Sequence, residues 1–552
     1  MKKQPKKYLH ESILILSVLF VVIASGQTQY AQPNPTSPNQ EVQIIEMRQG
    51  GDEGFSGTRI GLDSDVLVLV DRGNDIPIIF YHNGAYLFAD SVHFSRARNV
   101  FEAFSNVHMN QGDTLFMYAA YLHYDGNTGL ARLRDNVRLE DPTMTLFTDS
   151  LNFDRIANLG YFFDGGMLVD AENVLTSYWG QYNPDTNQAL FRDNVRLVNE
   201  NFTIYADTLL YNTATQYADI VGSSRIVSED GIIYTSRGWY HTESERSMLL
   251  DRSRVYSNDR TQMLTGDTIF YNRATGIGEA FGNMQLEDRE RSLILRGNYG
   301  FFNEFTEFGF ATDMAYAIDF SQADSLFIGG DSLFMITIDS IHRDFRAYAN
   351  VRIWREDFQA IADSIHYSAQ DSTIFMRGRP VLWSENQQIT GHEIDILMND
   401  STVERVYIRG SAFAIQYRGI DDQFNQLSGR NMTAYFRDGE LVRIWVEGSV
   451  ESLYYMVEDD GHVIGLNHTQ SPFMSADIDG EEIERLWWGG PAEATTTPLP
   501  QLSPGANRLT GFVWLYYLRP LHSRDIFRRS IRHAEDDLVV PQRAFVREVD
   551  VW

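Results

Sequence analysis

A pair made of an aspartate and a hydroxyl residue recurs along the chain, each time followed by an aliphatic and then an aromatic residue. Carboxylates in a row could serve acid–base catalysis or bind calcium. An active site needs one or two such groups, whereas this pair returns in unit after unit. Short polar side chains at the start of a strand more often bond nearby backbone amides and fix a corner. We therefore interpret these pairs as structural: Asp90-Ser91, Asp149-Ser150, Asp207-Thr208, Asp267-Thr268 and Asp363-Ser364.

Other candidates for chemistry are weak. The stretch from Asp477 to Glu482 resembles the beginning of a calcium loop but lacks the full ligand spacing. The sequence contains no nucleophile elbow, phosphate-binding glycine loop or His-Glu-x-x-His helix. We predict no catalytic residues, no metal site and no cofactor, and we do not expect an enzyme. Histidines on the predicted strands lack metal-type spacing: His93, His123, His241 and His366.

The elements that position these residues form a repeat of about 30 residues that runs from Ala89 to beyond Val450. Its second half reads Asn-Val-Arg-Leu at residues 136–139 and 194–197. Apolar positions alternate with polar ones, which predicts strands with one buried face. Turn formers follow the aromatic residue and predict hairpins. We therefore predict an all-β fold, an elongated repeat stack in which each unit buries its apolar face against its neighbours.

The apolar side chains of the repeat are the best candidates for a functional site. One interpretation is an ordinary core between two sheet faces. The other is a stack whose walls leave an apolar trough, which suits acyl chains because they need apolar contact without directional bonds. The sequence does not separate these interpretations. The candidate groove residues are Leu122, Tyr124, Val137, Leu139, Leu151, Phe153, Val195, Leu197, Leu209, Tyr211, Ile269, Tyr271, Ile365 and Tyr367.

Composition excludes several kinds of protein. The formal charge is -29, and the lysines are confined to positions 2, 3, 6 and 7. Such a chain repels nucleic acid, so we expect no nucleic-acid partner. There is no cysteine, which excludes disulfides and thiolate metal sites. Stability must therefore come from packing and backbone pairing.

The first residues predict export. Lysines are followed by an apolar stretch from Ile13 to Ala24 and then by small residues, the pattern of a secretory signal peptide. The alternative is an uncleaved anchor, although the stretch is shorter than the roughly 20 residues of a membrane-spanning helix. The predicted organisation is a signal peptide at 1–26, a flexible leader at 27–45, the repeat domain at 46–490, a Thr/Pro-rich linker at 491–507 and a C-terminal tail with an aromatic segment at 508–552.

The repeat resembles the OstA-like (organic-solvent-tolerance) repeat of the lipopolysaccharide-transport bridge proteins. The stretch from Asn136 to Asp154 carries the resemblance best, and the resemblance covers roughly residues 85–450. It implies a β-jellyroll, V-shaped in section, that carries the acyl chains of lipopolysaccharide or a related lipid across the periplasm without catalysis. It also implies partners among the transport-bridge proteins at the inner and outer membranes. In size the chain resembles a long variant without the barrel of the outer-membrane subunit.

Two other classes of protein stay open. An exported carbohydrate-active β-helix enzyme would need one unit with an unrepeated cluster of carboxylates and bases, and no unit stands out. A surface adhesin or structural stalk would have a closed core, which a cavity in the structure would contradict. The aromatic run from Phe512 to Leu518 is expected to cap the stack or to contact a partner, because terminal units must shield an open apolar end.

Overall fold

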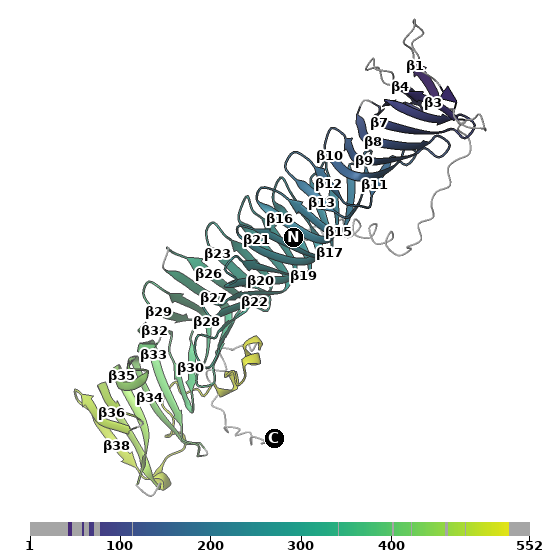
Figure 1. The fold of residues 1–552 in the computed structure, drawn as a ribbon. Helices are drawn as coiled ribbons and strands as arrows, with labels where there is room; N and C mark the ends of the chain where they lie inside the picture. The colour runs from purple at the N-terminus through teal and green to yellow at the C-terminus, as the bar shows by residue number, and fades with distance from the viewer. Residues whose placement is uncertain are drawn as a thin grey trace, which may run out of the picture.

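The computed structural model describes residues 42–46, 58–59, 66–70 and 78–528, except for a few positions within the last range: 113, 340–341, 400–401, 421, 459–461 and 481. It is an elongated stack of antiparallel strands (Figure 1), which confirms the predicted all-β repeat stack. The predicted signal peptide and most of the predicted leader lie outside the described residues. Within the described residues, no helix is long and apolar enough to cross a membrane.

The described strands form one 38-stranded sheet that bends into two walls. The strands that run through both walls are β7 (Val100–Gln111), β8 (Leu115–Asp125), β9 (Leu130–Glu140), β10 (Thr145–Asp154), β15 (Gln188–Val198), β16 (Phe202–Asn212), β17 (Tyr217–Ser228), β18 (Gly231–His241), β19 (Arg246–Ser257), β20 (Gln262–Asn272), β21 (Ile277–Asp288), β22 (Leu293–Asn303), β27 (Arg343–Trp354), β28 (Gln359–Ser368), β33 (Thr402–Tyr417), β34 (Phe424–Arg437), β35 (Glu440–Val457) and β36 (Val463–Asp479).

Shorter strands extend only one wall each. The first wall also contains β2 (Thr58–Arg59), β3 (Val66–Val70), β6 (Ser91–Ser95), β11 (Leu159–Phe162), β14 (Trp179–Asn183), β23 (Phe308–Thr312), β26 (Ser332–Thr337), β29 (Thr373–Arg377), β32 (Glu393–Asn399) and β37 (Glu482–Gly489). The second wall also contains β1 (Gln43–Glu46), β4 (Ile78–His82), β5 (Ala85–Ala89), β12 (Gly166–Val169), β13 (Val174–Ser177), β24 (Tyr316–Asp319), β25 (Leu326–Gly329), β30 (Val381–Ser384), β31 (Gln387–Thr390) and β38 (Glu493–Thr497).

A corner divides most of the long strands between the two walls. In β15 the pairing register shifts between Arg192 and Val195. The two residues between them, Asp193 and Asn194, have positive φ angles of 62° and 56°. Aspartate and asparagine tolerate this left-handed conformation better than most residues. The second half of the repeat therefore begins with asparagine because the chain turns from one wall to the other there.

The aspartates of the repeat lie at these corners. Asn106 Nδ2 donates a hydrogen bond to Asp90 Oδ2 over 2.7 Å. Asn283 Nδ2 donates in the same way to Asp267 Oδ2 over 2.8 Å. Each bond ties the first half of one repeat to the second half that follows it. Asp90 and Asp267 therefore lie at corners, as predicted, but their carboxylates accept from asparagine side chains, whereas the prediction had them bond nearby backbone amides.

The core lies between the two walls, and alternate side chains of each strand point into it. Its buried residues form two large clusters, one from Val42 to Tyr240 and one from Leu249 to Ala476. Together they extend along nearly the whole described stack. The side of the interior that faces the corner is sealed by backbone, and the opposite side ends in the hairpin turns of both walls. We call that turn-lined side the mouth.

The C-terminal chain folds back along the outer face of the second wall. Residues 491–507, predicted as a linker, contain β38 and the 3-10 helix η1 (Leu499–Gln501). We call residues 507–528 the strap; it contains the 3-10 helices η2 (Tyr516–Leu518) and η3 (Ser523–Phe527). The predicted domain boundaries themselves stay predictions.

Buried glutamines of the second wall bind the backbone of the strap. Gln388 Nε2 donates to the Val513 carbonyl oxygen, and Gln388 Oε1 accepts from the Leu515 N–H, both over 2.7 Å. Gln426 bonds residues 507 and 509 in the same way, over 2.8 and 2.9 Å. Each glutamine thus pairs with the strap as a neighbouring strand would, which satisfies backbone groups that burial would otherwise leave without partners.

Candidate functional site

The predicted groove residues all point into the interior. Leu122, Leu139, Leu151, Phe153, Leu197 and Leu209 are 0% exposed. Tyr271 and Tyr367 are partly exposed, and the other predicted residues are buried. The structure therefore places them on the inward faces of the two walls, those from Leu122 to Tyr211 in the first buried cluster and Ile269 and Ile365 in the second. Whether lipid occupies the interior stays a prediction.

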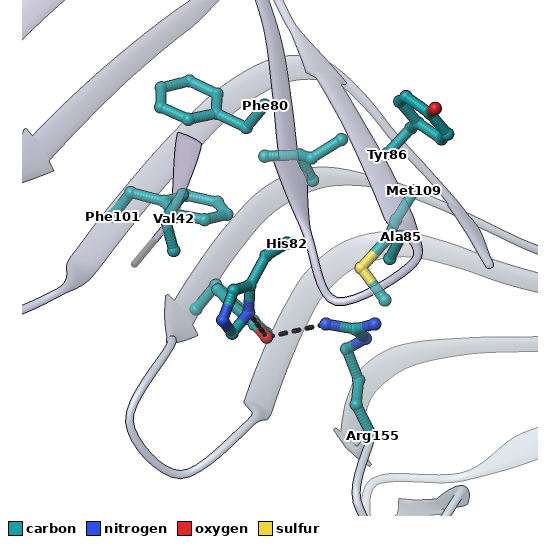
Figure 2. Close-up of a pocket in the computed structure, with 10 residues that line it drawn as sticks. Val42, Phe80, His82, Ala85, Tyr86, Phe101, Met109 and Arg155 are labelled. Carbon is teal, nitrogen blue, oxygen red and sulfur yellow. Dashed lines mark hydrogen bonds between the residues drawn. The ribbon is translucent and has the colours of Figure 1, made fainter. Parts of the chain in front are cut away.

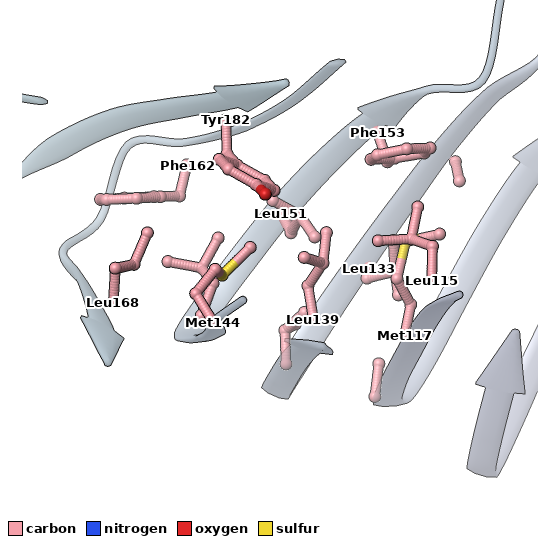
Figure 3. Packing of buried hydrophobic residues seen from close by; sticks show 14 of the residues in the cluster. Leu115, Met117, Leu133, Leu139, Met144, Leu151, Phe153, Phe162, Leu168 and Tyr182 are labelled. Carbon is pink, nitrogen blue, oxygen red and sulfur yellow. The ribbon is translucent and has the colours of Figure 1, made fainter. Parts of the chain in front are cut away.

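Between residues 78 and 245, which we call the closed segment, the interior is filled. Side chains from the two walls interlock, as around Leu139, Leu151 and Phe153 (Figure 3). A Cβ placed on Gly180 of the first wall would lie 2.4 Å from the Phe162 ring, so the ring occupies the space that a larger residue would need. The interior here is thus packed like an ordinary protein core, with side chains filling the space between the walls.

A small cavity lies at the N-terminal end of the closed segment (Figure 2). Its volume of about 10 Å³ is room for one water molecule. Beside it, His82 Nδ1 of the second wall lies 2.7 Å from the hydroxyl of Tyr124 in the first wall. Arg155 Nη1 also donates to that hydroxyl, over 2.8 Å, and Arg155 Nη2 donates to the Asn83 carbonyl oxygen over 3.1 Å. These bonds join the two walls across the mouth.

Similar bonds cross the mouth further along the closed segment. Tyr211 of the first wall donates to Asp170 Oδ2 in a turn of the second wall, over 2.5 Å. Tyr182 donates to Asp141 Oδ2 in the same arrangement. We call these and the following contacts cross-mouth bonds: Thr143 Oγ1 and Thr213 Oγ1 at 2.9 Å, Asn173 Nδ2 to Tyr211 Oη at 2.9 Å, Asn201 Nδ2 to Glu245 Oε1 at 2.6 Å, and the Arg273–Asp230 ion pair at 3.1 Å.

The tyrosines of these bonds are held in their protonated form. Burial raises the pKa of the Tyr211 hydroxyl above its usual value, and its hydrogen bond to Asp170 raises it further. The pKa of Tyr182 rises for the same reasons, with Asp141 as the acceptor. A protonated hydroxyl beside a carboxylate is the state that donates the bond. Tyr182 and Tyr211 therefore stay donors to Asp141 and Asp170 of the second wall and help to hold the two walls together at the mouth.

From residue 246 to residue 445, which we call the open segment, the interior is less covered. Many of its apolar side chains are only partly buried against the core. Among the described residues, the cluster from Val42 to Tyr240 has only Leu67 and Ile233 in that state. Phe302 is 38% exposed although it pairs with the inward position of Gly309. Partly exposed inward residues include Val255, Leu264, Leu286, Leu293, Ile328, Met335 and Phe345.

This arrangement can hold an apolar chain but offers little chemistry. The lining side chains are mostly aliphatic or aromatic, and the tyrosine hydroxyls among them, such as those of Tyr211 and Tyr271, are engaged in hydrogen bonds to carboxylates. In the part of the chain that the structure describes, no three histidine, aspartate or glutamate side chains gather closely enough to hold a metal ion. Apolar contact without directional bonds is what an acyl chain requires.

The sequence reasoning missed the cross-mouth bonds and the place of the strap. A signal for the strap was present in Val381-Leu382-Trp383, which is apolar on both faces of one strand. Leu382 faces the interior, while Val381 and Trp383 pack with Leu515 and Leu518 of the strap. A signal for the cross-mouth bonds was the tyrosine within the apolar row, because a buried hydroxyl needs a partner.

Comparison with known proteins gives a family match and matches among solved structures. Residues 74–207 match the family of OstA-like proteins, which confirms the predicted resemblance over that part of the chain. Among solved structures, the chain is similar to LptH from Pseudomonas aeruginosa, the LptA homologous periplasmic component of a lipopolysaccharide transport device. The sequences are 16% identical, and the match covers 19% of this chain and 81% of LptH with a TM-score of 0.18. Curated protein sequences give no match.

Proposed function

We propose that this protein, which is OstA-like over residues 74–207, carries the acyl chains of lipopolysaccharide or a related lipid through the periplasm for outer-membrane biogenesis. Its role is non-catalytic, and its partners are other transport-bridge proteins at the inner and outer membranes. The predicted signal peptide at residues 1–26 supports the periplasmic location.

One observation carries this proposal. The apolar interior continues from repeat to repeat, first as the cluster from Val42 to Tyr240 and then as the cluster from Leu249 to Ala476. Any stack of repeats buries a continuous core, because each unit packs on its neighbours. A core built only for stability does not need the partly exposed inward side chains of the second cluster, such as Leu264 and Phe345. A continuous apolar path suits a ligand that moves lengthwise.

Photo-crosslinking in cells tests the proposal. The photoreactive residue p-benzoylphenylalanine replaces Leu209, Tyr211 or Tyr271, whose side chains point inward. The matched control is Tyr205, which lies on β16 with Leu209 but points outward and is 38% exposed. We expect lipopolysaccharide adducts at inward positions and none at Tyr205. Absence of adducts at all inward positions would contradict the proposed function.

A structural stalk is the second candidate, because the interior of the closed segment is filled by its own side chains. In a stalk the interior serves stability alone. The same crosslinking experiment separates the two functions, since a stalk yields no lipid adduct at either the inward or the outward positions.

A further inference from the structure

The two segments differ most clearly at equivalent positions of the second wall. Ile204 of β16 and Leu264 of β20 occupy the same place in their repeats, two residues before Ala206 and Gly266 at the corners. Ile204 is 0% exposed, whereas Leu264 is only partly buried. Because the backbone positions match, the difference comes from how the mouth is covered.

Among the residues that the structure describes, the cross-mouth bonds end within the first repeat of the open segment. The last of them is the Arg273–Asp230 ion pair. The turns that follow bond within their own wall: Gln262 Nε2 donates to Asp288 Oδ2 over 3.0 Å in the second wall, and Tyr271 donates to Glu304 Oε2 over 2.7 Å in the first. The bonding pattern and the exposure of the interior therefore change at the same place.

We propose that acyl chains enter the interior through the mouth of the open segment, at residues 246–345, and that the cross-mouth bonds gate their passage into the closed segment. This inference rests on the proposed function and locates its loading site. It assigns to Tyr182 and Tyr211 a positioning role: they hold the two walls together and do not bind the lipid head group.

The chemistry of the lining favours an acyl chain over a peptide. An extended peptide brings one N–H and one carbonyl for each residue, and these need hydrogen-bond partners when buried. Val255, Leu264, Leu286, Met335 and Phe345 provide none, and the wall backbone around them is already paired within the sheet. An acyl chain carries no such groups and gains from apolar contact alone.

The cross-mouth bonds suit a gate because each one is modest by itself. When one of these hydrogen bonds opens, its donor and acceptor bond to water instead, so a single bond contributes little net free energy to the closed state. Opening one bond at a time lets a chain advance by one repeat without separating the walls along their whole length. The closed segment then returns to its filled state behind the lipid, as side chains such as Phe162 and Phe191 repack.

Labelling with palmitic acid that carries a diazirine on its acyl chain tests this inference on the purified full chain. After irradiation, mass spectrometry locates the label. We expect label at residues 246–345 in the wild type and less at residues 78–240. Tyr211→Phe removes the hydroxyl's bonds to Asp170 and Asn173 and should raise label in the closed segment at least fivefold, since loss of a single hydrogen bond already corresponds to about that change. The matched control is Tyr121→Phe, which removes a 2.8 Å bond to Glu102 on the outer face of the same segment and should leave the distribution unchanged.

A reversible lock provides the converse test. The natural chain has no cysteine, so Thr143→Cys with Thr213→Cys adds one cross-mouth disulfide and no other. The oxidised protein should lose label N-terminal to residue 143 and keep it at residues 246–345, and reduction should restore it. Circular dichroism checks that both forms are folded.

The outcomes separate this inference from the proposed function. Equal labelling of both segments in the oxidised and reduced forms would overturn the gate while leaving lipid binding intact. Labelling of no interior residue in any form would overturn the proposed function and the loading site together.

Discussion

The closed and open segments share one repeat and one backbone pattern but differ in how completely their apolar interior is covered. In the closed segment both walls interlock and polar bonds cross the mouth. In the open segment many inward side chains, such as Leu264 and Phe345, are partly exposed, although others, such as Leu333, stay buried. The repeat therefore decides how strands pair and where they bend, while a few residues in the turns decide whether the interior is covered.

On the outer face of the second wall the order is reversed: the closed segment is exposed to solvent there, and the open segment is covered by the strap. In the closed segment the second wall presents residues such as Arg225, which lies 4.6 Å above the ring of Tyr205, to solvent. At the C-terminal end the same face is apolar, with Trp383, Phe413 and Phe424 buried beneath the strap. The region with the less covered interior thus gains packing from outside. We infer that the strap compensates for stability that the open mouth does not provide.

Truncating Trp383, a large side chain buried beneath the strap, should cause the largest loss of stability. Trp383 is 0% exposed, and Trp383→Ala should destabilise β30 and the strap by about 4 kcal/mol, because it leaves a large cavity. Native-state hydrogen exchange of β30 and β31 measures the loss. Trp487→Ala is the control: Trp487 is 49% exposed, and its loss should cost about 0.5 kcal/mol or less. Similar costs at the two sites would show that the strap does not brace the wall.

A matched pair of core truncations compares the two interiors directly. Leu209→Ala in the closed segment should cost about 3 kcal/mol, because Leu209 is 0% exposed and fully packed. Leu264→Ala in the open segment should cost about 1 kcal/mol, because Leu264 is already partly exposed. Local unfolding free energies from hydrogen exchange provide the comparison. Equal costs would mean that the open segment is as tightly packed as the closed one.

The glutamine bonds to the strap should contribute less than its apolar contacts. Gln388→Leu removes the partners of the Val513 carbonyl and the Leu515 N–H, and should weaken strap docking by about 2 kcal/mol. Limited proteolysis within residues 507–528 reports the docking. Its exposed neighbour Gln387, changed to leucine, should leave the cleavage rate as it is. Unchanged cleavage in both variants would mean that apolar packing alone holds the strap on the second wall.

Alkaline pH should lower the stability of the closed segment, and this is the smallest of the four predicted effects. The raised pKa of Tyr211 means that the folded protein binds this proton more tightly than the unfolded chain does. Its contribution to stability is therefore complete below the usual tyrosine pKa of about 10 and is lost as pH rises through the folded-state value. Ultraviolet absorbance of tyrosinate should show one fewer late-ionising group in Tyr211→Phe. An unchanged titration would contradict the buried, bonded state of this hydroxyl.

Much of the fold could be predicted because its signals are local. Alternation in Leu209 and Tyr211 predicts a half-buried strand, and recurrence of Asp267 and its equivalents predicts a corner. The inward direction of the predicted groove residues follows from the same alternation. The strap could not be placed, because Arg352 and Leu518, which hydrogen-bond over 2.9 Å, lie 166 residues apart. Nothing in a local pattern specifies such a partner.

The sequence by itself determined the all-β repeat, its strands and corners, and a continuous row of apolar side chains, since each depends on residues a few positions apart. Only the tertiary structure decided where that row is covered. Tyr211 and Asp170 are 41 residues apart and belong to opposite walls, and they meet because the stack brings the turns of both walls to one side. Coverage of the interior depends on contacts between two facing walls, and the local sequence of one strand does not specify which residues face it.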